Sequence, residues 1–67
     1  MSFASDNLII GIDVEGTIKQ LTNIDADEGT YDIVDVDGQV FPTRDAIPVL
    51  RKLRENEPEK TFIAIPA

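Results

Sequence analysis

A seven-residue pattern occurs twice in this chain. It consists of an apolar residue, Asp, Val, an acid, Gly, a polar residue and an apolar residue, first around Gly16 and again around Gly38. An acid followed by Gly suits the two positive-φ positions of a type I′ turn, and the flanking β-branched residues favour strands. Both copies therefore predict strand–turn–strand corners, with Glu15 and Gly16 in the first turn and Asp37 and Gly38 in the second.

The second copy belongs to a predicted hairpin, Thr30–Pro42. A two-residue turn would place Val34, Val36 and Phe41 on one face of this hairpin. A β-bulge near Ile33 would turn the remaining apolar side chains to the same face. Without that bulge, we expect a strand buried on both faces, as in a small closed barrel.

The rest of the chain contains a helical pattern between strand patterns. Alternating apolar residues predict strands at 8–14 and 17–24, and Gly29 supplies a left-handed residue in the loop that follows. Residues 45–56 predict one helix with Asp45 as N-cap. Its apolar stripe has helical spacing and consists of Ala46, Val49, Leu50 and Leu53.

These segments predict one domain over 1–67. The class is α+β, mainly β: a small, strongly bent antiparallel sheet or an SH3-like barrel, in the order β-β-β-β-α-β, with the last strand beside the first. The expected parts are an N-terminal arm at 1–7, a β-meander at 8–42, the helix at 45–56 and the last strand at 61–65.

Composition narrows the possible chemistry. The chain has 67 residues, no cysteine and no histidine. Disulfides and thiolate metal sites are therefore excluded, and the usual general base near neutral pH is missing. We expect a protein that is not an enzyme and has no cofactor and no metal site. A chain this short buries only about 60% of its unfolded surface, so we expect a protein partner or further copies to add stability.

Charge is distributed unevenly along the chain. Residues 1–43 carry nine acids and one base, whereas residues 44–67 carry four acids and five bases, and the whole chain has a net charge of −7. Non-specific nucleic-acid binding needs a basic surface, so we do not expect it. No apolar run is long enough to span a membrane, and the N-terminal residues lack the pattern of a secretory signal. These features predict a cytoplasmic protein, or a virion protein if the source is viral.

One stretch resembles a catalytic motif. Ile33–Val40 is similar to the first motif of the haloacid-dehalogenase-like phosphatases, an apolar strand ending in D-x-D-G-T-[LV], and Ile12–Ile18 resembles it with Glu as the second acid. The resemblance implies that Asp35 is a nucleophile and Asp37 an acid/base, both holding magnesium, on a parallel sheet. Gln39 stands where that motif has Thr, and a chain of 67 residues has no room for the later motifs.

The acidic residues of the N-terminal, acid-rich part of the chain also suggest two hypotheses that involve no catalysis. They could bind Ca²⁺ or Mg²⁺ opportunistically, although the spacing lacks the Gly and terminal Glu of an EF-hand loop. They could also imitate the charge spacing of DNA and block a nucleic-acid-binding protein. The ordinary alternative is that they are turn residues and solvent-facing strand residues. The acids concerned are Asp25, Asp27, Glu28, Asp32, Asp35 and Asp37.

By elimination, we expect a non-enzymatic protein-interaction or structural module. It would be a small subunit of a larger multi-copy assembly, for example a phage virion accessory or decoration protein. The alternatives are the acidic inhibitor and, more remotely, a magnesium-dependent phosphatase-like fragment. The candidate interaction residues come from the basic helix and the apolar ends of the chain: Phe3, Arg51, Lys52, Arg54, Phe62, Ile63 and Ile65.

Overall fold

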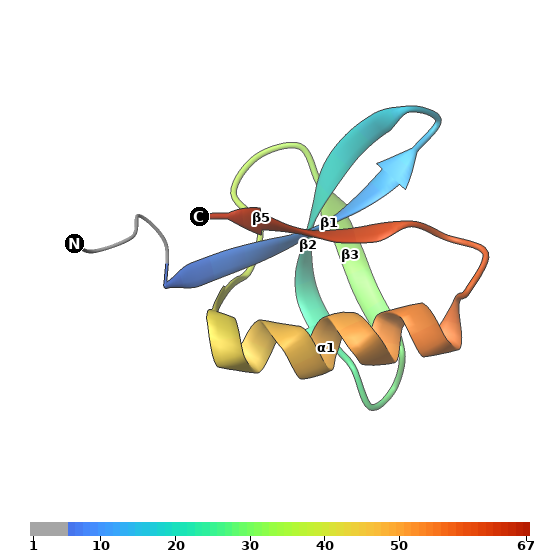
Figure 1. Ribbon diagram of the computed structural model, residues 1–67. Coiled ribbons are helices and arrows are strands. Elements are labelled where there is room, and N and C mark those ends of the chain that lie inside the picture. The colour runs from blue at the N-terminus through green and yellow to red at the C-terminus, as the bar shows by residue number, and fades with distance from the viewer. Residues whose placement is uncertain (1–5) are drawn as a thin grey trace.

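The computed structural model describes residues 6–67. Four strands, one helix and a final strand follow one another along this part of the chain (Figure 1). Their bounds are β1, Asn7–Val14; β2, Thr17–Asp25; β3, Thr30–Val34; β4, Val40–Pro42; α1, Thr43–Asn56; and β5, Phe62–Pro66. All strand pairs are antiparallel. The predicted mainly-β α+β class is confirmed, as an open sheet rather than a closed barrel.

Strand β1 is the centre of the sheet. Its residues 11–14 pair with β2 and its residues 7–9 pair with β4, so these two strands share one edge of β1. β5 occupies the opposite edge along residues 8–12, which confirms that the last strand returns beside the first. β3 pairs only with β2. Strands β3, β4 and β5 therefore each pair with a single strand, and β3 and β5 lie on opposite sides of β1.

The first predicted turn joins β1 to β2. Glu15 and Gly16 have φ values of 53° and 85°, as a type I′ turn requires, and Val14 stands opposite Thr17. The Gly16 N–H donates to Asp13 Oδ1 at 2.8 Å. The local sequence pattern predicts this turn correctly because the turn and the two strands that it joins are consecutive in sequence.

The second predicted turn does not form, and the hairpin interpretation of Thr30–Pro42 is wrong. β3 pairs with β2 and β4 pairs with β1, so Asp37 and Gly38 lie in a segment that crosses β2 between the two strands. Only Gly16 and Gly29 among the described glycines have positive φ. β4 pairs with the stretch of β1 that β2 leaves unpaired, and this long-range pairing takes the place of a local turn.

The bulge also lies on a different strand from the one predicted. The pairing of β2 with β3 shifts between Thr22 and Asp25, where Asn23 has a φ of 50°. The predicted bulge near Ile33 is therefore wrong. The Ile24 N–H within the shifted stretch donates to Gln39 Oε1 at 2.9 Å, so the crossing segment satisfies a backbone group that the bulge takes out of the ladder.

Helix α1 begins at Thr43, two residues before the predicted start. Pro42 occupies the N-cap position with a φ of −56° and makes no side-chain cap, and Asp45 lies in the first turn. The Thr43 N–H instead donates to the Asp6 carbonyl at 2.8 Å. The Asp45 N-cap is therefore wrong, because the chain just before β1 satisfies the first helical N–H group.

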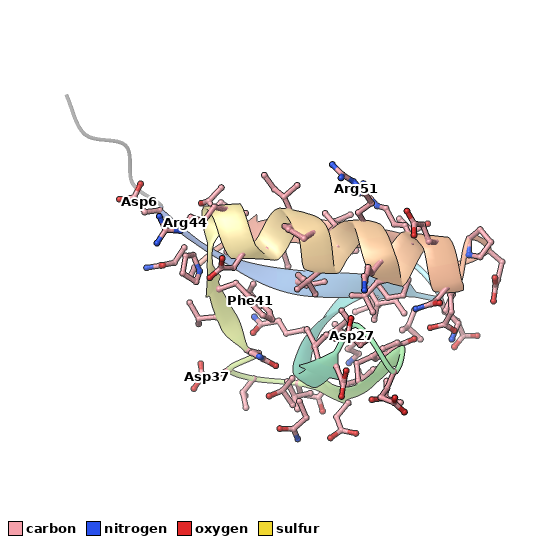
Figure 2. All side chains as sticks on the ribbon, turned by 90° about the horizontal axis from the view of Figure 1, so that it is seen from below. Asp6, Asp27, Asp37, Phe41, Arg44 and Arg51 are labelled. Carbon is pink, nitrogen blue, oxygen red and sulfur yellow. The ribbon has the colours of Figure 1, made fainter. Side chains whose placement is uncertain are left out.

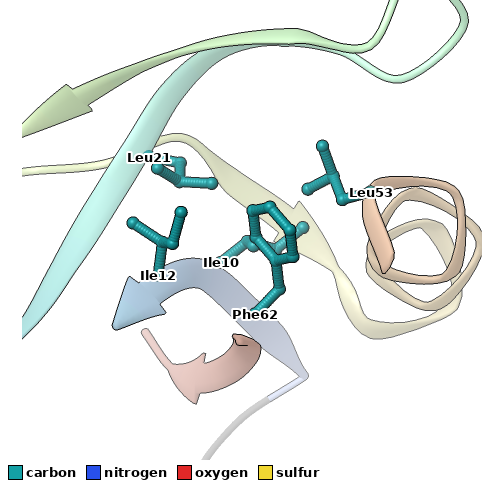
Figure 3. Close-up of a cluster of buried hydrophobic side chains, with 5 residues drawn as sticks. All are labelled: Ile10, Ile12, Leu21, Leu53 and Phe62. Carbon is teal, nitrogen blue, oxygen red and sulfur yellow. The ribbon is translucent and has the colours of Figure 1, made fainter. Parts of the chain in front are cut away.

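The core lies between α1 and one face of the sheet, which we call the inner face. Figure 3 shows its five buried side chains, which come from three strands and the helix: Ile10, Ile12, Leu21, Leu53 and Phe62. Each fully buried side chain of this size contributes roughly 1.5–3 kcal/mol to folding. The apolar stripe of α1 is confirmed, because Ala46 and Leu53 are buried and Val49 and Leu50 pack against the cluster.

Candidate functional site

The opposite side of the sheet, which we call the outer face, also carries apolar side chains, next to polar ones such as Asp13 and Gln20. Antiparallel partners share a face, so the register places Ile65 and Val40 beside Ile9, and Ile63 beside Gly11. No helix of the described chain packs on this face, because α1 packs on the core side. The outer face therefore carries β-branched side chains that nothing in residues 6–67 covers as α1 covers the inner face.

Gly11 makes this apolar region continuous. A Cβ atom added at Gly11 would lie 2.9 Å from Ile18 Cγ2 and 2.9 Å from Ile65 Cδ1. The side chains on either side of β1 thus meet over the glycine. We call this region the outer patch, and it consists of Ile9, Ile18, Val40, Ile63 and Ile65.

The outer patch is open to solvent at its margins. Ile18 and Val40 are 43% and 53% exposed, whereas the other three side chains are half-buried. The crossing segment passes beside the patch, since a Cβ added at Gly38 would lie 3.0 Å from Ile9 Cγ2. Val36 in that segment is 72% exposed. A contiguous exposed patch of this kind marks interaction sites more often than scattered apolar residues do.

A second surface lies beside α1, near the outer edge of β5. It is a hollow of about 290 Å³, which we call the α1 groove, and it is lined by Ile47, Leu50, Arg51, Arg54 and Glu55. Arg54 connects the helix to β5, because its Nη2 and Nε donate to the Phe62 carbonyl at 2.8 and 3.3 Å. Ile47 is 50% exposed. The groove therefore combines apolar side chains with two guanidinium groups and the carboxylate of Glu55.

Lysines and arginines differ in their partners. The three lysines of the described chain form ion pairs: Lys19 with Asp35 at 2.9 Å, Lys52 with Asp27 at 2.6 Å, and Lys60 with Glu57 at 2.6 Å. Hydrogen bonds from these lysines lower the pKa of Asp27, Asp35 and Glu57. Within residues 6–67, no arginine forms an ion pair with an acid.

The helix separates the acidic and basic surfaces. Figure 2 shows Arg51 and Asp27 on opposite sides of α1, with Asp27 and Asp37 on the side of β2 and β3. Lys52 reaches toward that side and pairs with Asp27, whereas Arg51 and Arg54 line the α1 groove. One edge of the protein is therefore rich in acids and the opposite edge presents arginines.

The structure divides the predicted interaction residues among different places. Arg51 and Arg54 lie together in the α1 groove, Ile63 and Ile65 lie together in the outer patch, and Lys52 belongs to neither. Phe62 is only 1% exposed and its ring packs edge-on against Tyr31, so its assignment to an interaction surface is wrong. Phe62 was predicted from its place in the apolar C-terminal segment, but its position opposite Ile12 turns its side chain into the core. Phe3 lies outside the described residues.

Sequence reasoning missed part of both surfaces. Ile9, Ile18 and Val40 of the outer patch and Ile47 of the α1 groove were not among the predicted interaction residues. A signal for Ile9 was present, because Ile9 and Gly11 alternate with the core residues of β1 and so define its second face. Ile47 has no such signal, because it precedes Pro48 and the residue before a proline is biased away from helical backbone.

The acids of the phosphatase-like motif do not form a comparable site. Asp35 is bound to Lys19, and Asp37 lies farther along the crossing segment. The sheet is antiparallel, so the parallel sheet that the resemblance implied is absent from residues 6–67. No group of three or more acids in the described part of the chain is placed to hold a metal ion.

Two further findings concern the whole described chain. Helix α1 is too short and too polar to cross a membrane, and residues 6–67 contain no other helix. Comparison with protein families, curated proteins and solved structures finds no match to the chain.

Proposed function

We propose that this protein is a non-enzymatic interaction module that works as a small subunit of a multi-copy assembly. The observation that carries the proposal is the outer patch. Within the described chain, the single helix α1 covers only the inner face of the sheet. The apolar side chains of the outer face would be removed from water by binding a second protein surface. The small core of residues 6–67 supports the same proposal, because association adds buried apolar surface.

The composition of the outer patch supports a protein partner. Its five side chains are aliphatic and β-branched, and four strands contribute them. Charged residues are depleted at the centres of protein interfaces, and the side chains that meet over Gly11 are aliphatic, with Asp13 at the margin of the patch opposite Ile18. Rigid strands also present these side chains with little loss of conformational entropy on binding.

The acidic-inhibitor alternative has less support. Mimicry of DNA needs carboxylates that are available to a nucleic-acid-binding protein. Asp27 and Asp35, two of the acids considered for that role, are each bound to a lysine of the same chain. These pairs reduce the negative charge that the acidic edge can present.

Light scattering on a pair of matched variants tests the proposed function. Ile18→Asp places a charge on the outer patch, whereas Thr17→Asp places the same charge on the neighbouring exposed residue, which faces the other side of β2. We expect the wild type and Thr17→Asp to form multimers as concentration rises from micromolar to millimolar. We expect Ile18→Asp to remain smaller at each concentration.

Two results would contradict the proposal. One is a wild-type protein that stays monomeric at millimolar concentration. The other is an Ile18→Asp variant that has the same mass as Thr17→Asp at every concentration, which would show that the outer patch takes no part in association.

A further inference from the structure

We propose that copies of this chain join edge to edge, with strand β3 of one copy pairing antiparallel with strand β5 of the next. This inference rests on the proposed function and names the partner surface as a second copy of the chain. Ile33 of β3 would stand opposite Ala64 of β5 and would extend its side chain over the α1 groove.

The open edge of β5 is defined by the hydrogen bonds at its ends. Asp13 N–H donates to the Thr61 carbonyl at 3.0 Å, and Ala67 N–H donates to the Asn7 carbonyl at 3.1 Å. Backbone groups alternate in direction along an antiparallel strand, so the N–H and C=O of Ala64 point away from β1. The neighbouring outward positions are restricted, because Arg54 holds the Phe62 carbonyl and Pro66 has no N–H. Ala64 is therefore the centre of the available edge.

The open edge of β3 is defined by the crossing segment. Gln39 N–H donates to the Leu21 carbonyl at 2.7 Å, so Leu21 directs its backbone groups away from β3. Ile33 stands opposite Leu21 in the register. The N–H and C=O of Ile33 therefore point away from β2, toward the outside of the sheet. Ile33 is also 49% exposed, although it lies on the inner face.

These two edges match in direction and in face. β3 runs parallel to β1, and β5 runs antiparallel to β1, so β3 of one copy is antiparallel to β5 of another when both cores face the same way. Ile33 and Ala64 both lie on the inner face. Paired opposite each other, they exchange two backbone hydrogen bonds, with Cα atoms about 5.5 Å apart.

The α1 groove provides complementary side chains for this pairing. On the inner face, an added strand beside β5 lies next to the groove, whose apolar residues Ile47 and Leu50 would contact Ile33. Asp35 follows two residues later and would stand opposite Phe62, beside Arg54. Asp35 has a side chain that is 82% exposed, so its pairing with Lys19 leaves it accessible to a second cation.

The predicted contact is head to tail. Each copy offers two different edges, so a copy that has paired through β5 still presents its own β3 to a further copy. Such contacts close into rings or continue as filaments, depending on the rotation between neighbours. The outer patch lies on a different face of the sheet from the α1 groove and is available for contact with further copies.

Disulfide trapping between copies tests the pairing, because the chain has no cysteine. An Ile33→Cys variant is mixed with an Ala64→Cys variant and oxidised with oxidised glutathione. A Cα separation of about 5.5 Å is within the range for a disulfide. The matched control mixes Asp32→Cys with Ala64→Cys, because Asp32 is exposed and adjacent but belongs to the opposite face. We expect the Ile33–Ala64 pair to give cross-linked dimers about ten-fold faster than the control.

A second pair of variants tests the α1 groove. Arg51→Glu changes the charge in the groove, and Arg44→Glu makes the same change at an exposed position in the first turn of α1. We expect Arg51→Glu to lower the average mass in light scattering and Arg44→Glu to leave it unchanged. Equal masses for the two variants would show that the groove takes no part in the contact.

The outcomes separate this inference from the proposed function. Multimers without faster Ile33–Ala64 cross-linking would overturn the strand pairing and leave the proposed function standing. Fast cross-linking together with equal masses for Ile18→Asp and Thr17→Asp would support the strand pairing. It would also show that the outer patch takes no part in association. A monomeric protein that cross-links no faster than the control would overturn both.

Discussion

Replacing Gly38 with Asn distinguishes the observed crossing segment from the hairpin that the sequence suggests. A type I′ turn at Asp37 and Gly38 would tolerate Asn, because Asn adopts left-handed backbone more readily than other residues. In the structure, Gly38 has no positive φ and is needed for another reason. A Cβ there would lie 2.7 Å from the Leu21 carbonyl oxygen, 2.9 Å from Gln20 Cβ and 3.0 Å from Ile9 Cγ2.

The cost of this substitution follows from those contacts. Overpacking against backbone costs about 1–3 kcal/mol. The crossing segment must also move away from β2. This movement weakens two hydrogen bonds of 2.7 Å, from the Gly38 N–H to Gln20 Oε1 and from the Gln39 N–H to the Leu21 carbonyl. Each such bond contributes about 1 kcal/mol. We therefore expect Gly38→Asn to lower the free energy of unfolding by about 2–4 kcal/mol.

Urea denaturation followed by circular dichroism measures this loss. The total stability expected for a domain of this size is about 3–10 kcal/mol, so the midpoint should fall markedly. Gly16→Asn is the matched control, because Gly16 has a φ of 85° and no atom within 4 Å of its added Cβ. We expect the control to cost about 1 kcal/mol, since Asn adopts left-handed backbone more readily than other residues but less readily than Gly. Equal, small losses in both variants would refute the crossing segment and restore the hairpin.

Three further predictions concern single residues. The pKa of Glu57 is lowered from 4.5 by hydrogen bonds from Lys60 and Tyr31, so its contribution is present above the unfolded pKa and is lost as pH falls through the lower folded value. Glu57→Gln should therefore flatten the dependence of the urea midpoint on pH in acid, and an unchanged slope would contradict this. Burial raises the pKa of Tyr31, so absorbance should show its phenolate forming at higher pH in the folded protein than in urea. Gly11→Val should destabilise the sheet by about 1–3 kcal/mol in urea denaturation, because its Cβ would meet Ile18 at 2.9 Å.

Sequence patterns correctly predicted the turn and the helix whose stabilising contacts are between residues close together in the sequence. The turn at Glu15 and Gly16 formed because its two strands are contiguous, and the stripe from Ala46 to Leu53 formed because a helix needs only its own periodicity. The same turn pattern failed at Asp37 and Gly38. The two strands that flank Asp37 and Gly38 do not pair with each other. β2 leaves the first residues of β1 unpaired, and β4 pairs with those residues. The local sequence around Gly38 gives no indication that residues 7–9 of β1 are available for pairing.

The candidate surfaces show the same division. Ile63 and Ile65 were predicted from an apolar strand, and Arg51 and Arg54 from a basic helix. Their separation into an outer patch and an α1 groove depends on the face of β5 that each residue occupies, which only the pairing with β1 decides. Phe62 differs from Ile63 by one position and is in the core for that reason. A one-residue change of register moves a strand residue from one face to the other.

Hydrogen exchange at the edge of β5 tests the central claim most directly. The amide of Ala64 points away from β1, whereas the amide of Ile63 points toward it, so the two neighbours report on the open edge and on the sheet itself. If copies pair through β3 and β5, exchange of the Ala64 amide slows as protein concentration rises, while exchange of the Ile63 amide stays slow throughout. An Ala64 amide that exchanges at the same fast rate at all concentrations would contradict the account.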